Sequence, residues 1–289
     1  MKKLKNKKIV IWTANGLGDI TMSFPLLNYF KRKGAHITLI GIHKNYLKFL
    51  KHWGMIDNYI TFKYKENQSK VFWAKERFKI MFDVGMLRAD TMIVLSKNSF
   101  FNNIRYKSFF AVENYFFIEN GTCYNQCDLN NKILKEHYSY DVKEEDYYFC
   151  KELKDSFDKF KTSKDYIAIN PFSKKPDTII KPKYFYSLLD RKENYCLIGS
   201  LDNDIKDYKK KNISNTLSND FYRSLFILYH AKYLITGDSG VMHFNLALRK
   251  KTVSYWKEAR PRPEEVIRKI NLSEEHIVKD SNFEVVQKV

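Results

Sequence analysis

Long apolar runs are missing from this 289-residue sequence. None approaches the roughly eighteen residues that a membrane-spanning helix needs. The basic N-terminus is followed by a short apolar run, residues 9–14, that leads into a loop with two glycines. A secretory signal has a longer apolar region and a cleavage site with small residues. We therefore expect a soluble, cytoplasmic protein.

Cysteine is also scarce. The four cysteines form no C-x-x-C pair, and an α/β chain of this length does not need disulfide bonds. We expect reduced, mostly structural thiols. The cysteines are Cys123, Cys127, Cys150 and Cys196, and the first two would bind a metal only if histidines joined them in space.

Several catalytic signatures are absent as well. The sequence has no H-E-x-x-H zinc motif, no G-x-S-x-G nucleophile elbow, no protein-kinase motif set and no zinc-deaminase pattern. It also lacks a recognisable nucleic-acid-binding module, so nucleic-acid binding would depend on charge and aromatic residues alone. We expect no nucleic-acid partner.

Positive charge is present in excess. The chain carries 51 basic and 33 acidic residues, a net charge of +18. Residues 1–150 hold 24 basic and 14 acidic residues (+10), which leaves 27 and 19 (+8) for the remainder. Both halves therefore favour anionic partners, such as phosphates, nucleic acid or an acidic membrane face. A lysine-rich but merely solvated surface is the alternative.

Short β-branched runs alternate with amphipathic segments in the first hundred residues. This alternation predicts a parallel sheet covered by helices on both faces. Residues 98–150 are aromatic, asparagine-rich and poorly periodic, and we expect them to end the first domain. The predicted strands are 8–13, 36–41, 59–62 and 91–95, and the predicted helices are 20–33, 45–53 and 71–82.

The alternation restarts at Tyr166 and predicts a second α/β domain. We predict Rossmann-like domains at 1–160 and 161–289, with a ligand cleft between the carboxyl ends of their strands. The predicted strands here are 166–170, 195–199, 233–236 and 252–256, and the predicted helices are 183–189, 221–231 and 241–248.

The first candidate motif is the loop between the first strand and the first helix. Gly16 and Gly18 let the backbone turn tightly and approach a ligand, and Asp19 stands where exposed helix amides favour a carboxylate. Asp19 is either a helix cap or a functional group, since G-x-G-D lacks both the P-loop lysine and the third glycine of a dinucleotide-binding loop. Pro25 should kink the helix or delay its start.

The second candidate motif is a later strand, loop and helix at 235–243. The amides of Ser239, Gly240 and Val241 would form a seat for a diphosphate at the positive end of the helix. His243 lies about one turn into that helix. It either faces the same ligand or packs as an ordinary side chain.

Two further loops carry polar residues. The loop 170–182 offers the hydroxyl of Ser173 and a lysine, Lys181, that could neutralise phosphate, as could Lys174 and Lys175, unless these lysines are only solvated.

In the loop 199–204, Asp202 could hydrogen-bond a ribose or, with Asp204, imitate a D-x-D metal site. An aspartate-rich turn is the plainer interpretation of this loop.

Together the two motifs resemble the bacterial ADP-heptose:lipopolysaccharide heptosyltransferases, which belong to glycosyltransferase family 9. The G-L-G-D loop is similar to that family's N-terminal loop, which ends in aspartate. Asp238, Ser239, Gly240 and His243 are similar to its late D-T-G-x-x-H motif, with Ser in place of Thr. The resemblance implies an α/β protein of the GT-B fold, in which two Rossmann-like domains with parallel sheets face a central cleft.

The resemblance also implies an inverting, metal-independent glycosyltransferase without a cofactor, in which Asp19 deprotonates the acceptor hydroxyl. The N-terminal domain would bind the acceptor and the C-terminal domain the nucleotide sugar. Asn15, Gly16 and Gly18 would form the acceptor loop, and the donor would be bound by Ser173, Lys181, Asp202, Asp238, Ser239, Gly240 and His243.

The implied reaction is transfer of heptose from an ADP-linked donor to a surface glycan such as the core of lipopolysaccharide or lipooligosaccharide. The basic surface would hold the protein against anionic glycolipid at the cytoplasmic face of the inner membrane. A catalytically inactive GT-B-like protein that only binds nucleotide sugar, or serves as a scaffold, is the alternative. A sugar-nucleotide epimerase or hydrolase would need a further carboxylate.

Overall fold

A computed structural model of the chain describes most residues in two compact units, Met1–Tyr147 (unit 1) and Tyr148–Val289 (unit 2). The described residues are 4–13, 16–63, 70–95, 110, 112–117, 126–160, 165–173, 179–237, 239–255 and 277–278.

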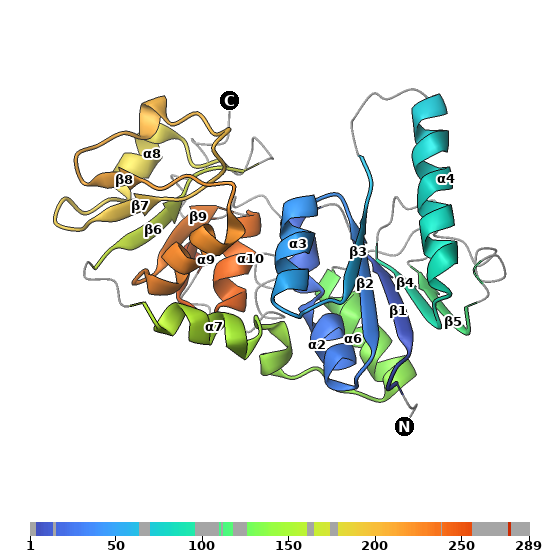
Figure 1. The fold of residues 1–289 in the computed structure, drawn as a ribbon. Coiled ribbons are helices and arrows are strands. Elements are labelled where there is room, and N and C mark those ends of the chain that lie inside the picture. Colours follow the sequence, from blue (N-terminus) through green and yellow to red (C-terminus); the bar gives the residue numbers. More distant parts are fainter. Residues whose placement is uncertain are drawn as a thin grey trace. The chain divides into compact units, whose positions relative to one another are not determined.

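Unit 1 is built on a five-stranded parallel sheet with the strand order β3-β2-β1-β4-β5 (Figure 1). The central strand buries four residues in a row after Lys8, as a strand covered on both faces must. The strands are β1 (Lys8–Trp12), β2 (His36–Gly41), β3 (Asn58–Thr61), β4 (Thr91–Val94) and β5 (Asn114–Phe117). The helices are α1 (Leu17–Met22), α2 (Phe24–Arg32), α3 (Lys44–His52), α4 (Lys70–Leu87) and α6 (Gln126–Tyr138), followed by the short 3-10 helix η1 (Glu144–Tyr147).

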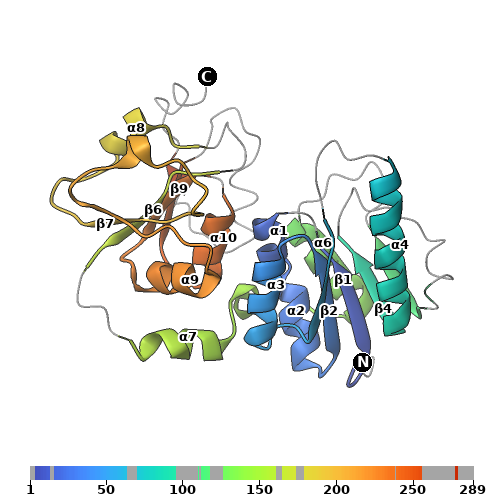
Figure 2. The ribbon, with the colours of Figure 1, turned by 45° about the horizontal axis from the view of Figure 1, so that its top comes forward.

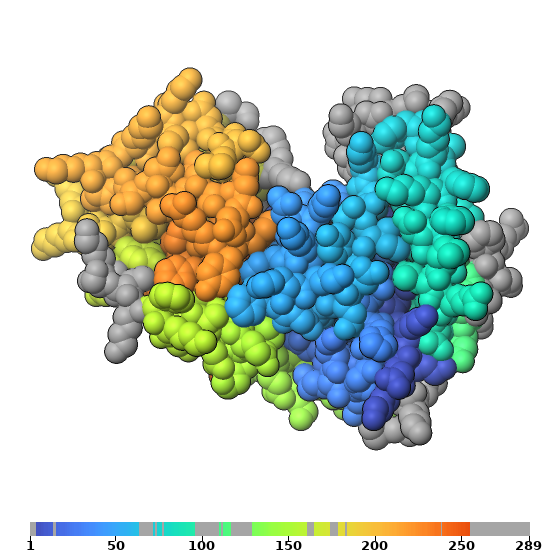
Figure 3. Space-filling model, in the orientation of Figure 1, coloured from blue at the N-terminus to red at the C-terminus, as the bar shows by residue number. Residues whose placement is uncertain are grey.

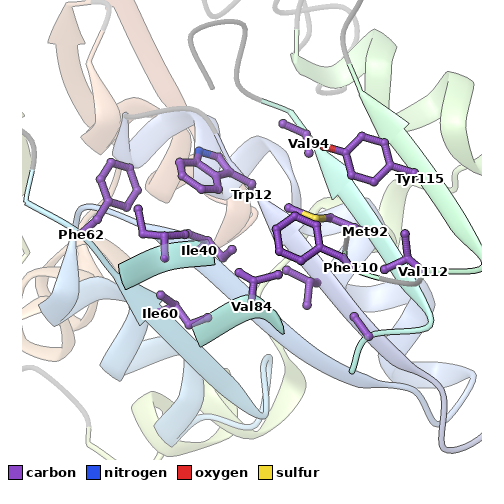
Figure 4. Packing of buried hydrophobic residues seen from close by; sticks show 13 residues of the cluster. Trp12, Ile40, Ile60, Phe62, Val84, Met92, Val94, Phe110, Val112 and Tyr115 are labelled. Carbon is purple, nitrogen blue, oxygen red and sulfur yellow. The ribbon is translucent and has the colours of Figure 1, made fainter. Parts of the chain in front are cut away.

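One core of unit 1 lies between the sheet and α4 (Figure 4). The ring centroids of Trp12 and Phe62 lie 5.0 Å apart. Val84 of α4 is 1% exposed and packs with Met92 and Phe110 in the same cluster. This packing uses one side of α4 only.

The predicted helix 20–33 is two helices in the structure. α1 ends at Met22, α2 starts at Phe24, and Ser23 between them is fully buried. Pro25 lies in the first turn of α2, where a proline costs no helical hydrogen bond. The predicted helix is therefore interrupted just before Pro25, whereas the expectation was a kink or a delayed start at this proline.

The end of unit 1 is tied to α2 through a buried carboxylate. The side chain of Asp146 is fully buried and forms an ion pair with Arg32, whose side chain is 46% exposed. One Asp146 oxygen also accepts hydrogen bonds from the Tyr140 hydroxyl (2.7 Å) and the Lys143 amide (2.9 Å). Burial and this carboxylate raise the pKa of Tyr140 to about 12, so its hydroxyl stays a donor.

Unit 2 is built on a six-stranded parallel sheet with the order β11-β10-β9-β6-β7-β8. Figure 2 shows β9, β6 and β7 of this sheet beside one another. Read from β8, with strands numbered within the unit, the order is that of a dinucleotide-binding sheet. The strands are β6 (Ile167–Asn170), β7 (Tyr195–Leu197), β8 (Ile213–Asn215), β9 (Leu234–Gly237), β10 (Thr252–Tyr255) and β11 (Ile277–Val278). The helices are α7 (Lys151–Asp158), α8 (Pro182–Ser187), α9 (Phe221–His230) and α10 (Gly240–Ala247).

Helix α7 belongs to unit 2 because it packs on α9, and Figure 3 shows these two surfaces side by side in yellow-green and orange. Phe157 is fully buried and its ring lies 5.2 Å from Tyr222 and 5.3 Å from Tyr229. The units therefore divide after Tyr147, earlier in the chain than the predicted boundary after residue 160.

The two cysteines whose side chains are described, Cys150 and Cys196, are half-buried and take part in no disulfide bond. Burial raises the pKa of both thiols, which keeps them protonated and unreactive. The side chains of Cys123 and Cys127 lie outside the described residues.

Candidate functional site

Each sheet has one place where the direction of strand addition reverses. In unit 2 this place lies between β6 and β9, because β7 follows on one side and β10 on the other. In unit 1 it lies between β1 and β4. Ligands of open α/β sheets bind outside the carboxyl ends of the strands at such points. Both candidate motifs leave the sheet there.

Three side chains meet at the carboxyl ends of β6 and β9. Strand pairing sets Asn170 opposite Thr236. The Asn170 amide donates to the Ser239 hydroxyl (3.1 Å), which lies 3.0 Å from the Thr236 hydroxyl, and Thr236 donates to the carbonyl of Gly237 (3.1 Å). A single direction of donation satisfies the whole chain of hydrogen bonds when Ser239 donates to Thr236.

This network determines how α10 begins. Ser239 is the N-cap residue in an extended conformation, yet among the described residues its hydroxyl contacts Asn170 and Thr236 rather than an amide of α10. The first-turn amides of a helix have no carbonyl partner within it. Those of Gly240 and Val241 thus stand at the positive end of an eight-residue helix whose cap is engaged elsewhere.

The other predicted residues of this motif have different positions. His243 lies in the second turn of α10 and is 7% exposed, so its ring is largely packed inside unit 2. Asp238 lies outside the described residues. The structure therefore brings Ser239 and Gly240 to the switch point together with Asn170, which the sequence did not single out.

The loop after β6 stays at the same edge of the sheet. The Phe172 amide donates to the side chain of Asn170 (3.2 Å), and the Ile180 amide donates to the carbonyl of Pro171 (2.9 Å). Half-buried Ser173 follows Phe172, and Lys181 is the N-cap residue of α8. Lys174 and Lys175 lie outside the described residues.

The loop after β7 adjoins this one. Asn203 accepts a hydrogen bond from the Ser200 amide (2.8 Å), which closes a tight turn after Gly199. Asp202 is exposed and accepts from the Ser200 hydroxyl (3.3 Å), while Asp204 accepts from the Lys206 amide (3.0 Å). These are the local bonds of an aspartate-rich turn. Within the described residues, no three His, Cys, Asp or Glu side chains are grouped to hold a metal ion.

Gly199 has no room for a side chain. A Cβ atom there would lie 2.6 Å from Asn203 Oδ1 and 2.7 Å from the Phe172 ring. We expect Gly199→Ala to destabilise unit 2 by about 1–3 kcal/mol, because the two loops must move apart. Gly85→Ala, where a Cβ meets nothing within 4 Å in helix α4, should instead stabilise by up to about 1 kcal/mol. Urea unfolding of both variants measures the difference; equal stabilities would contradict the packing.

In unit 1, Asp19 is the third residue of α1. Its carboxylate turns back over Gly16 and accepts that residue's amide hydrogen at 2.9 Å. A Cβ on Gly16 would lie 2.6 Å from the carboxylate oxygen, so glycine is required for this approach. Gly18 is buried, and Asn15 lies outside the described residues.

The last turn of α1 is hydrogen-bonded to a buried tyrosine of α3. Thr21 lies 2.9 Å from the hydroxyl of Tyr46 on α3, which is fully buried. Burial raises the pKa of Tyr46 far above its usual range, so the tyrosine remains a neutral hydrogen-bonding partner. Asp19 itself is half-buried at the switch point of its sheet.

Known proteins resemble the chain in structure but not in sequence. No protein-family model matches it, and no curated protein matches it. A glycosyl transferase of family 9 from Veillonella parvula superimposes with a TM-score of 0.62 at 16% identity, covering 90% of this chain and 83% of that one. The chain thus has the GT-B fold, as the resemblance implied.

Two Escherichia coli structures give similar values. Heptosyltransferase WaaC with ADP-2-deoxy-2-fluoro heptose has a TM-score of 0.61 at 12% identity, covering 89% of this chain and 91% of that one. ADP-heptose lps heptosyltransferase II has a TM-score of 0.61 at 16% identity, covering 88% and 86%. Within the described residues of this chain, no helix is both long and apolar enough to cross a membrane.

Proposed function

We propose that the chain is a glycosyltransferase whose unit 2 binds a nucleoside-diphosphate sugar. The observation that carries this proposal is the Asn170, Ser239 and Thr236 network at the switch point. It occupies the N-cap hydroxyl and leaves the first amides of α10 for an anion. A helix end whose first amides are left open in this way suits a bound phosphate.

The leaving nucleoside diphosphate gains negative charge as the sugar departs. The amides of Gly240 and Val241 would stabilise that charge, since preorganised donors need no rearrangement during the reaction. Lys181, at the end of the loop that follows β6, would neutralise a phosphate. Asp202 would meet the ribose, and His243 would support the sugar or phosphate from within the helix. Ser239 acts as a positioning residue, because its hydroxyl is engaged by Asn170 and Thr236.

Asp19 would be the base that deprotonates the acceptor hydroxyl, with inversion at the anomeric carbon and without a metal ion. An ionised aspartate can accept that proton while the oxygen attacks. Its neighbours Gly16 and Gly18 would let the acceptor approach the backbone. The sugar would be heptose and the nucleotide ADP, in line with the names of the E. coli structures. The acceptor would be an anionic glycolipid at the cytoplasmic face of the inner membrane.

The nucleotide site is tested by Gly240→Pro. Proline is well accommodated at the first position of a helix, and the preceding Ser239 has the extended backbone (φ −144°, ψ 163°) that proline requires. The substitution removes one amide donor and leaves the helix in place. We expect affinity for the matching nucleoside diphosphate to fall about tenfold or more, as for loss of a hydrogen bond to a charged group.

Gly240→Ala is the matched control, because it keeps the amide. Calorimetric titration should give it an affinity near that of the wild type, and thermal unfolding without ligand should give all three proteins similar melting temperatures. If folded Gly240→Pro and Gly240→Ala bind the diphosphate with equal affinity, the α10 amides do not contribute to binding.

A further inference from the structure

Helix α4 exposes large apolar side chains on the side away from its core. Phe78, Phe82 and Met86 are 73%, 60% and 69% exposed, whereas Ile80 and Val84 on the opposite side are 2% and 1% exposed. The three exposed residues are spaced four apart and therefore form one row along the helix. We refer to Phe78, Phe82 and Met86 as the α4 row. Figures 1 and 2 show α4 along the edge of unit 1.

A row of basic side chains runs beside the apolar one. Lys75 and Lys79, also four apart, are exposed and alternate with the α4 row around the same face. The segment 70–88 contains five basic and two acidic residues, a net charge of +3. One of the acids, Glu76, is half-buried and accepts the Lys63 amide (3.1 Å), and the other, Asp83, is half-buried. Positive charge therefore dominates this face.

We propose that the α4 row docks on the surface of an anionic lipid bilayer, with α4 lying parallel to the membrane plane. Apolar side chains would enter the boundary between headgroups and acyl chains, while Lys75 and Lys79 extend toward lipid phosphates. Lysine is depleted in the core of protein–protein interfaces, which makes a protein partner a poorer fit. A symmetric pairing of two α4 rows would bring the lysines of both copies together.

This proposal rests on the proposed function and adds how the transferase reaches a membrane-bound acceptor. Vesicle binding and nucleotide binding are separate measurements, so one proposal can fail without the other. The test is flotation with vesicles of phosphatidylethanolamine containing phosphatidylglycerol. Phe78→Ser with Phe82→Ser should lower the fraction bound about tenfold or more, because two apolar anchors are lost. Lys75→Glu with Lys79→Glu should lower it by a similar factor on these vesicles.

The matched control is Phe160→Ser with Leu201→Ser, which removes two exposed apolar side chains elsewhere (58% and 63% exposed) and should bind like the wild type. Nucleotide-induced stabilisation should be unchanged in every variant, which also shows that each is folded. A wild type that stays unbound, or equal flotation of the Phe78/Phe82 variant and the control, overturns the proposal. So does a wild-type dimer that the Phe78/Phe82 variant converts to monomer without change in flotation.

Discussion

Asp19→Asn is expected to lower the rate of sugar transfer by a factor on the order of 10²–10⁴, the usual contribution of a positioned base. The amide oxygen of asparagine can still accept the Gly16 amide hydrogen, so the start of α1 should survive the change. Nucleotide affinity should persist, because the proposed diphosphate site lies in unit 2. Release of nucleoside diphosphate in the presence of acceptor glycolipid measures the rate.

A second capping aspartate supplies the control. Asp220 caps α9 and accepts the Tyr222 amide at 2.9 Å, as Asp19 accepts the Gly16 amide. Asp220→Asn should therefore leave transfer unchanged. The hydrogen bond to Gly16 by itself suits a purely structural aspartate, which is what the inactive binding protein would contain. An unchanged transfer rate in Asp19→Asn would show that Asp19 is not the base.

Arg32→Ala is expected to destabilise unit 1 by about 2–3 kcal/mol, because it leaves the carboxylate of Asp146 buried without its ion-pair partner. The estimate is at the low end for buried pairs, since the Arg32 side chain is itself half in water. Tyr140 and the Lys143 amide still donate to the carboxylate and limit the loss. Urea unfolding measures the change.

Two further variants make this expectation specific. Arg32→Ala with Asp146→Asn should be more stable than Arg32→Ala alone, because the buried charge is removed along with its partner. Lys135→Ala, which breaks the exposed pair with Asp141 (75% and 86% exposed), should cost less than about 1 kcal/mol. Equal losses in Arg32→Ala and Lys135→Ala would mean that burial of Asp146 is not the cause.

Most of the parallel sheets could be predicted from the sequence. Buried parallel strands form continuous β-branched runs, and β1, β2, β6 and β9 lie within a residue or so of their predicted places. β8 was missed because it has three residues, two of them exposed. α6 was missed among aromatic and asparagine residues, although its buried Leu129, Ile133 and Leu134 follow a helical spacing that could have revealed it.

Only the parts of the candidate site that are formed by residues close together in the sequence could be predicted. Turns from strand to helix pointed to Asp19, Ser239 and Gly240, and each lies at a switch point. Asn170 was passed over because its partner Ser239 is 69 residues away, and only the pairing of β6 with β9 brings them together. A polar residue that ends a buried strand was the available signal.

The exposure of the α4 row could not be predicted either. Apolar residues occur all around this helix, so periodicity alone does not tell which side packs on the sheet. The choice depends on how Ile80 and Val84 fit the side chains of β1 and β4.

Thermal unfolding with ADP, UDP, GDP and CDP, each with and without EDTA, tests the central claim most directly. A ligand that binds only the folded protein stabilises it by about 2.7 kcal/mol at a hundred times its Kd. Binding of a nucleotide sugar in unit 2 predicts a raised melting temperature with one of these diphosphates, unchanged by EDTA and weakened in Gly240→Pro. No stabilisation by any of them would contradict the nucleotide site and with it the transferase.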